Sequence, residues 1–178
     1  MQSLRDLRTA VRRMDAPAIS LFKNRIALAG VFKHKRPAMP ARNMRTNVEF
    51  TSDAFPPYPG EDEKVNPGIW GQRLAEFIVS RLPEYGVETG NFYPEDWGWE
   101  IPVKNEAFPI FIGCGNKTEP GGTRFLCFID PSTPETRTGL FKKVSTLADV
   151  DRVADALDEV LQSHPAIKDL RWLANDEI

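Results

Sequence analysis

The residues most able to do chemistry are concentrated in one short run, PEDWGWE at residues 94–100. Two adjacent carboxylates, Glu95 and Asp96, precede two tryptophans, Trp97 and Trp99. Carboxylates can bind a cation or transfer a proton, and an indole ring can bind a cationic group. The run therefore suggests three kinds of site: a metal site, an acid–base site, or a surface that recognises a basic partner.

A structural role is the stronger interpretation for the two tryptophans. Every second residue from Trp97 to Val103 is large and apolar, as on the buried face of a strand. Trp97 and Trp99 are then both core residues, and Gly98 between them allows a neighbouring element to approach closely. The two acids would form a polar start to this strand, and the pattern leaves their role open.

A second acidic cluster, Glu61-Asp62-Glu63, lies in a loop rich in proline and glycine. The composition favours a solvated loop, with Glu61 and Asp62 as candidate binding residues. If Asp62 lay beside Glu95 and Asp96, the three carboxylates could supply oxygen ligands for metal-assisted hydrolysis. The sequence assigns no catalytic residue, no metal ligand and no cofactor.

Other catalytic groups are sparse. The chain has two histidines and two cysteines, and it lacks the phosphate-loop, zinc-protease and nucleophile-elbow motifs. His164 precedes Pro165 at the end of a predicted helix, where the helix dipole favours a capping role. Cys114 and Cys127 lie in apolar runs, which predicts buried free thiols.

Apolar periodicity predicts an α+β fold around these residues. Two amphipathic helices are expected, the first starting at Asn66-Pro67 and ending near Pro83, the second spanning residues 146–164. The order β-α-β-β-β-β-α-β predicts a two-layer sandwich, in which two helices cover one face of a mainly antiparallel sheet. The predicted strands are residues 47–52, 87–92, 97–104, 108–114, 124–129 and 167–173.

The central strands predict a second apolar face on this sheet. Phe111, Leu126 and Phe128 alternate with the residues of the helix-covered face, so they point away from the helices. Such a face needs its own cover. The N-terminal segment is one candidate, and a partner subunit in a homodimer is the other.

Charge divides the chain near residue 45. Residues 1–45 carry 11 bases and 2 acids, a net charge of +9, whereas the remainder carries 12 bases and 23 acids, a net charge of −11. We expect a basic extension at residues 1–43 and a single acidic α+β domain at residues 44–178. Three interpretations of the extension stay open: a tail for nucleic acid or an anionic surface, an arm that covers the domain, or translated upstream sequence with Met44 as the natural start.

The hydrophobic runs are short. Ile26–Phe32, the longest near the N-terminus, is far below the roughly 20 residues that a membrane span needs. It also lacks a signal-peptide cleavage site. We therefore expect a cytoplasmic location and no membrane partner.

Three glycine- and tryptophan-containing motifs resemble the pattern of a group of small bacterial hypothetical proteins of unknown function. The motifs are Asn66-Pro67-Gly68 with Gly71, residues 95–99 (EDWGW), and Gly113 with Gly115. The similarity covers about residues 48–172 and excludes the basic segment. It implies the domain boundary and no activity, cofactor or catalytic residue.

These observations predict a non-enzymatic acidic binding module for a protein or peptide partner, inhibitor- or immunity-like by analogy alone. Nucleic acid is expected to bind only through residues 1–45, because an acidic surface repels it. Whether the chain catalyses a reaction stays open, with the metal-assisted hydrolase as the alternative. The predicted binding residues are Glu95, Asp96, Trp97, Trp99, Glu61 and Asp62.

Overall fold

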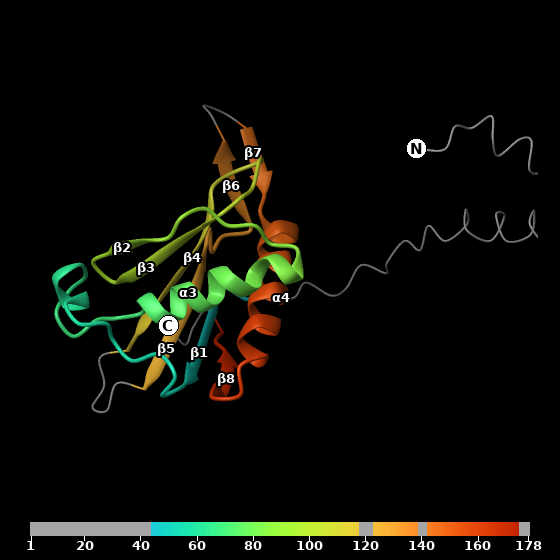
Figure 1. Cartoon of the computed structure of the whole chain (residues 1–178). Helices are drawn as coiled ribbons and strands as arrows, with labels where there is room; N and C mark the ends of the chain where they lie inside the picture. The colour runs from blue at the N-terminus through green and yellow to red at the C-terminus, as the bar shows by residue number, and fades with distance from the viewer. Residues whose placement is uncertain (1–43, 118–122, 139–141, 175–178) are drawn as a thin grey trace, which may run out of the picture. The chain divides into compact units, whose positions relative to one another are not determined.

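A six-stranded antiparallel sheet runs through the computed structural model, which describes residues 44–117, 123–138 and 142–174. The strand order is β2-β3-β4-β5-β1-β8, and every neighbouring pair is antiparallel (Figure 1). The strands are β1 (Asn47–Thr51), β2 (Tyr93–Glu95), β3 (Gly98–Val103), β4 (Ile110–Asn116), β5 (Arg124–Asp130) and β8 (Lys168–Trp172).

Two α-helices, α3 (Gln72–Arg81) and α4 (Leu147–Gln162), cover one face of this sheet (Figure 1). Each buries an apolar stripe at helical spacing, for example Leu74 and Ile78 in α3. Short 3₁₀ helices, η1 (Glu61–Glu63) and η2 (Leu82–Tyr85), flank α3 on either side. The predicted α+β sandwich is therefore confirmed.

The covered face and the helices form the core. Val48 and Phe50 of β1 pair with Cys127 and Phe125 of β5, and all four side chains are buried. Cys114 of β4 lies directly opposite Cys127. Both thiols are free and buried, as expected, and burial raises the pKa of each.

The predicted start of the first helix at Asn66-Pro67 is wrong. The N–H of Ile69 donates a hydrogen bond of 3.0 Å to the Asn66 carbonyl, closing a turn with Pro67 and Gly68 at its centre. Gly68 has a φ of 81°, the left-handed conformation that a type II turn requires of its third residue. The helix itself starts at Gln72, because the Pro-Gly pair favours a turn over a helical first residue.

The second strand is also displaced from its predicted position at residues 87–92. β2 comprises Tyr93–Glu95, and only Thr89 of the predicted range pairs, as an isolated bridge with Val103. A further hairpin, β6 (Glu135–Thr138) and β7 (Lys142–Ser145), lies where a loop was expected. Its sequences, ETRT and KKVS, lack the apolar alternation that would have revealed it.

The predictions for the basic extension, including the apolar run at residues 26–32, lie outside the described residues. Residues 118–122, between the predicted strands at residues 108–114 and 124–129, lie outside them as well. Within the described ranges, no helix combines the length and apolar character required to cross a bilayer.

Candidate functional site

The candidate site is the sheet face that points away from α3 and α4, here called the open face. Strand register determines its members, because side chains alternate between the two faces. Tyr93 pairs with Glu100, Gly113 with Phe128, and Leu126 with Glu49. The open face includes Tyr93, Glu95, Glu100, Pro102, Phe111, Gly113, Arg124, Leu126, Phe128, Asn47, Glu49 and Arg171.

An aromatic cluster of Trp97, Phe111 and Phe128 occupies the middle of the open face. The ring centroids of Trp97 lie 4.9 Å from Phe128 and 6.4 Å from Phe111, and those of Phe111 and Phe128 are 6.0 Å apart. Gly113 forms the floor of the cluster: a Cβ there would lie 2.3 Å from the Phe128 ring and 2.7 Å from the Trp97 ring. Trp97 is 38% exposed, so the cluster meets solvent.

The prediction that Trp97 is a core residue is therefore wrong, whereas Trp99 is buried as expected. Glu95 pairs with Gly98, so Asp96 and Trp97 form the turn between β2 and β3. Gly98 has a φ of 143°, which side chains other than glycine rarely adopt. This turn interrupts the period-two alternation, and Trp97 consequently packs on the face opposite to Trp99.

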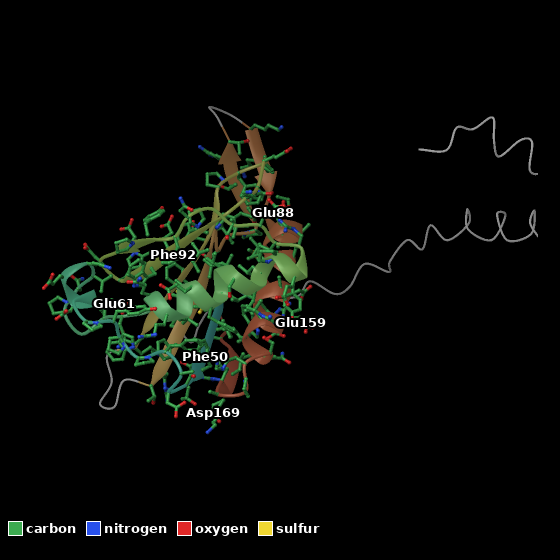
Figure 2. The ribbon with its side chains drawn as sticks, viewed as in Figure 1. Phe50, Glu61, Glu88, Phe92, Glu159 and Asp169 are labelled. Carbon is green, nitrogen blue, oxygen red and sulfur yellow. The ribbon has the colours of Figure 1, made fainter. Side chains whose placement is uncertain are left out.

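Glu61 is buried rather than solvated, which corrects its assignment to a solvated loop (Figure 2). Its Oε1 accepts hydrogen bonds of 2.7 Å from the backbone N–H groups of Gly71 and Gln72, and one of 2.8 Å from Nε1 of Trp99. Its Oε2 accepts one of 2.8 Å from the Tyr58 N–H. Glu61 thus satisfies the unpaired N–H groups at the start of α3 and anchors the core tryptophan.

The environment of Glu61 favours its charged form. Burial acts to raise the pKa of this carboxyl, but the hydrogen bonds from Gly71, Tyr58, Gln72 and Trp99 outweigh burial, and the pKa is lowered. Both carboxylate oxygens of Glu61 accept hydrogen bonds from groups of the domain itself, so Glu61 supports the fold and does not face a partner. The neighbouring Asp62 and Glu63 are exposed, as a solvated loop predicts.

Glu95 and Asp96 sit at the tip of the β2–β3 hairpin. Glu95 is half-buried on the open face, whereas Asp96 is exposed and its carbonyl accepts a hydrogen bond of 3.2 Å from the Asn66 N–H. Among the residues that the structure describes, no three His, Cys, Asp or Glu side chains are placed to hold a metal ion together. Glu95, Asp96 and Asp62 therefore do not assemble the ligand set that the hydrolase alternative needs.

An ion cluster that the sequence analysis missed lies toward the opposite edge of the open face. Glu49 is 8% exposed and accepts bonds of 2.8 Å from Arg171 and 3.2 Å from Lys117. The hydrogen bond from Arg171 lowers the pKa of Glu49, and the hydrogen bond from Lys117 acts in the same direction. Burial acts to raise this pKa, but the two hydrogen bonds outweigh it. The sequence signal that could have revealed this ion cluster was Glu49 itself, a charged residue inside the strand NVEFT.

A pocket of about 360 Å³ lies beside this ion cluster. It is lined by Glu49, Phe50, Thr51, Arg124, Asp169 and Arg171.

The two edges of the sheet are poorly suited to pairing with another strand. β2 has three residues, of which Pro94 lacks an N–H donor. The pairing of β8 with β1 is irregular between Glu49 and Thr51, and Asp169 of β8 has a φ of 53°. Short, irregular or proline-containing edges prevent sheet extension. Neither edge of this sheet therefore favours the addition of a further strand.

Comparison of the chain with protein-family models, with curated proteins and with solved structures finds no match in any of the three. Function is therefore inferred from the geometry of this chain.

Proposed function

We propose that the domain is a non-enzymatic protein-binding module that uses the open face. The observation that carries this proposal is the aromatic cluster: Trp97 is 38% exposed, on a sheet face that neither α3 nor α4 covers. Tyr93, 40% exposed, lies on the same face. Exposed aromatic residues gathered on one surface are typical of interaction sites, and tryptophan and tyrosine are enriched among the residues that dominate binding energy.

The charges around the cluster indicate the chemistry of the partner. Glu95 and Glu100 lie on the open face beside Trp97, and Asp96 is exposed in the same turn. The hydroxyl of Tyr93 donates a hydrogen bond to Glu100, which raises the pKa of Tyr93 to about 12 and keeps the phenol neutral. A partner that presents apolar side chains flanked by lysine or arginine fits this surface. Rim carboxylates would then steer its approach.

Selection from a random peptide library displayed on phage tests the proposal, with the purified chain as the target. We expect the selected peptides to combine large apolar residues with Lys or Arg. Trp97→Ala is expected to weaken their binding at least tenfold, equivalent to about 1.4 kcal/mol. Tyr85→Ala provides the matched control, because Tyr85 is an aromatic residue with similar exposure (36%) in η2, outside the sheet.

Two further measurements make this test decisive. Gly113→Ala is expected to weaken binding as well, because the added Cβ must displace the rings of Phe128 and Trp97. Glu100→Gln is expected to reduce both the affinity and its dependence on salt, since screening acts on exposed charges. Peptides whose affinity is unchanged by Trp97→Ala and Gly113→Ala, in variants whose urea melts show a folded domain, would contradict the proposal.

A further inference from the structure

Three carboxylates of the strands adjoin the aromatic cluster of the open face. Glu100 is the strand partner of Gly113, the floor of the cluster, and Asp130 is the strand partner of Phe111. Paired residues point to the same face of a sheet, so Glu100 and Asp130 lie on the open face, as Glu95 does. A ligand that packs on the cluster therefore meets negative charge at its flanks.

The basic side chains of this face lie farther from the cluster. Arg124 begins β5 and Asp130 ends it, so the two residues are roughly 20 Å apart along the strand. Arg171 belongs to β8, two strands away from β5. Lys117, which follows β4, and Arg171 both bond to Glu49. The cationic flanks of a ligand thus find carboxylates, rather than these bases, beside the aromatic rings.

The polypeptide enters the sheet next to the aromatic cluster. Asn47, the first residue of β1, pairs with Phe128, and neighbouring strands are about 4.8 Å apart. Met44, the first residue that the structure describes, is three positions before Asn47. The covalent attachment point of residues 1–43 is therefore close to a strand that lies beside the cluster.

Residues 23–36, with the sequence KNRIALAGVFKHKR, have the composition that the open face favours. An apolar run, Ile26–Phe32, includes four large side chains: Ile26, Leu28, Val31 and Phe32. Two bases precede the run and three follow it, namely Lys23, Arg25, Lys33, Lys35 and Arg36, and residues 23–36 contain no acid. An apolar segment between two groups of cations matches the chemistry of the partner that the aromatic cluster and its carboxylates indicate.

The connection between this segment and the domain is long enough to reach the cluster. Residues 37–43 form the connection, and seven extended residues span up to roughly 25 Å. The cluster extends from β5, next to β1, to the turn that follows β2, four strands from β1 and thus at most roughly 19 Å away. A ligand joined through a short linker has an effective concentration in the millimolar range. Even a weak ligand of this kind occupies its site for most of the time.

We infer that the occupant of the open face is the chain's own segment 23–36, which an external partner has to displace. This inference rests on the proposed function and adds regulation to it. The apolar run supplies side chains to the aromatic cluster, and the flanking cations pair with the carboxylates beside it. Because only the unoccupied fraction of the molecules can bind another ligand, the segment lowers the apparent affinity for every external partner.

Photo-crosslinking in the full chain tests the contact. The chain carries p-benzoylphenylalanine at position 32 and is irradiated at about 1 μM, far below the effective concentration of a linked segment, so that contacts within one molecule dominate. We expect cross-links to the tryptic fragments that contain Trp97, Phe111 or Phe128. The control carries the same group at position 11, because Val11 is an apolar residue beside arginines in the same basic extension. Equal cross-linking from both positions would show unspecific attraction and overturn the inference.

A synthetic peptide of residues 23–36, labelled with a fluorophore, measures the competition. We expect the full-length double variant Leu28→Ser, Phe32→Ser to bind this peptide at least threefold more tightly than the wild-type chain, because its own segment no longer competes. The matched control is Leu4→Ser, Leu7→Ser, which makes similar changes outside the segment and should bind as the wild type does. Adding Trp97→Ala to the first double variant should weaken binding of the peptide at least tenfold.

The outcomes separate this inference from the proposed function. If the peptide does not bind the first double variant, and position 32 does not cross-link to the open face, the inference is overturned. Trp97-dependent binding of library peptides by the same protein then leaves the proposed function standing. If position 32 cross-links to the open face but the library yields no binder, the inference stands and the proposed external partner does not. Should the double variant fail to stay folded in urea melts, the cross-links of the otherwise unchanged chain decide.

Discussion

The indole Nε1 of Trp99 donates a hydrogen bond of 2.8 Å to Oε1 of Glu61, a residue 38 positions earlier in the chain. The same oxygen accepts the N–H groups of Gly71 and Gln72 at the start of α3. One carboxylate therefore joins η1, the first turn of α3 and strand β3. This arrangement fixes the position of β3, and with it the turn that presents Trp97 on the open face.

Replacing Glu61 with glutamine should destabilise the domain. Glutamine has one acceptor oxygen in place of two, and its NH₂ group meets the N–H of Tyr58 or the N–H groups at the start of α3. Leaving a buried donor without a partner costs about 1–3 kcal/mol, and we expect a loss of that size in urea melts. Glu63→Gln, an exposed neighbour in η1, should stay within about 0.5 kcal/mol of wild type. Equal effects of the two variants would contradict the capping role.

Acid should weaken the domain through the same carboxylate. The pKa of Glu61 is lowered in the folded state from its ordinary value of 4.5. Its contribution to stability is therefore fully present above about pH 4.5 and is lost as the pH falls through the folded-state value. Urea melts from pH 7 downward should show the difference between wild type and Glu61→Gln shrinking below pH 4.5. A difference that stays constant down to the acid transition would show that the charge of Glu61 does not contribute.

The two tryptophans should respond differently to truncation. Trp99 is 4% exposed, and Trp99→Ala is expected to cost about 3–5 kcal/mol, as is usual for a large buried aromatic residue. Trp97→Ala removes a partly exposed ring and its contacts with Phe111 and Phe128, an expected loss of about 1–2 kcal/mol. Denaturant melts measure both. A larger loss of stability in Trp97→Ala than in Trp99→Ala would contradict the assignment of Trp99 as the buried tryptophan and Trp97 as the partly exposed one.

Both cysteines should resist thiol reagents in the native protein. Burial raises the pKa of Cys114 and Cys127, and the thiolate is the reactive form. Labelling with Ellman's reagent should therefore be limited by global unfolding, whereas both thiols should react at once in denaturant. Rapid reaction of one thiol under native conditions would show local opening of β4 or β5, which carry the two residues.

A chain that begins at Met44 should fold. Met44 and Thr46 are buried, and the Thr46 carbonyl accepts a hydrogen bond of 2.7 Å from the Ile129 N–H. We expect its stability to match the full chain within about 1 kcal/mol. A chain that begins at Asn47 is the control and should lose about 2–3 kcal/mol, because it lacks the buried methionine and this hydrogen bond. Aggregation of the Met44 chain would show that residues 1–43 contribute to folding.

Local patterns in the sequence were sufficient for most of the architecture. The short run at residues 124–129, apolar on both faces, predicted the central strand β5, and the apolar stripe in residues 147–161 predicted helix α4. Such periodicity reports burial within a single element, because side-chain direction repeats every 2 or 3.6 residues. It also predicted a second apolar face with Phe111, Leu126 and Phe128, which is the face that carries the candidate site.

Only the tertiary structure decided which residues the site contains. Trp97 and Trp99 have the same spacing as core residues, yet the turn at Asp96-Trp97 places them on opposite faces. Glu61 and Glu95 are both acids in polar stretches of the sequence, but Glu61 meets its partners 10 and 38 residues away and becomes buried. Turns reverse the direction of side chains, and hydrogen bonds between distant segments determine which charges leave solvent. Neither effect leaves a periodic trace in the sequence.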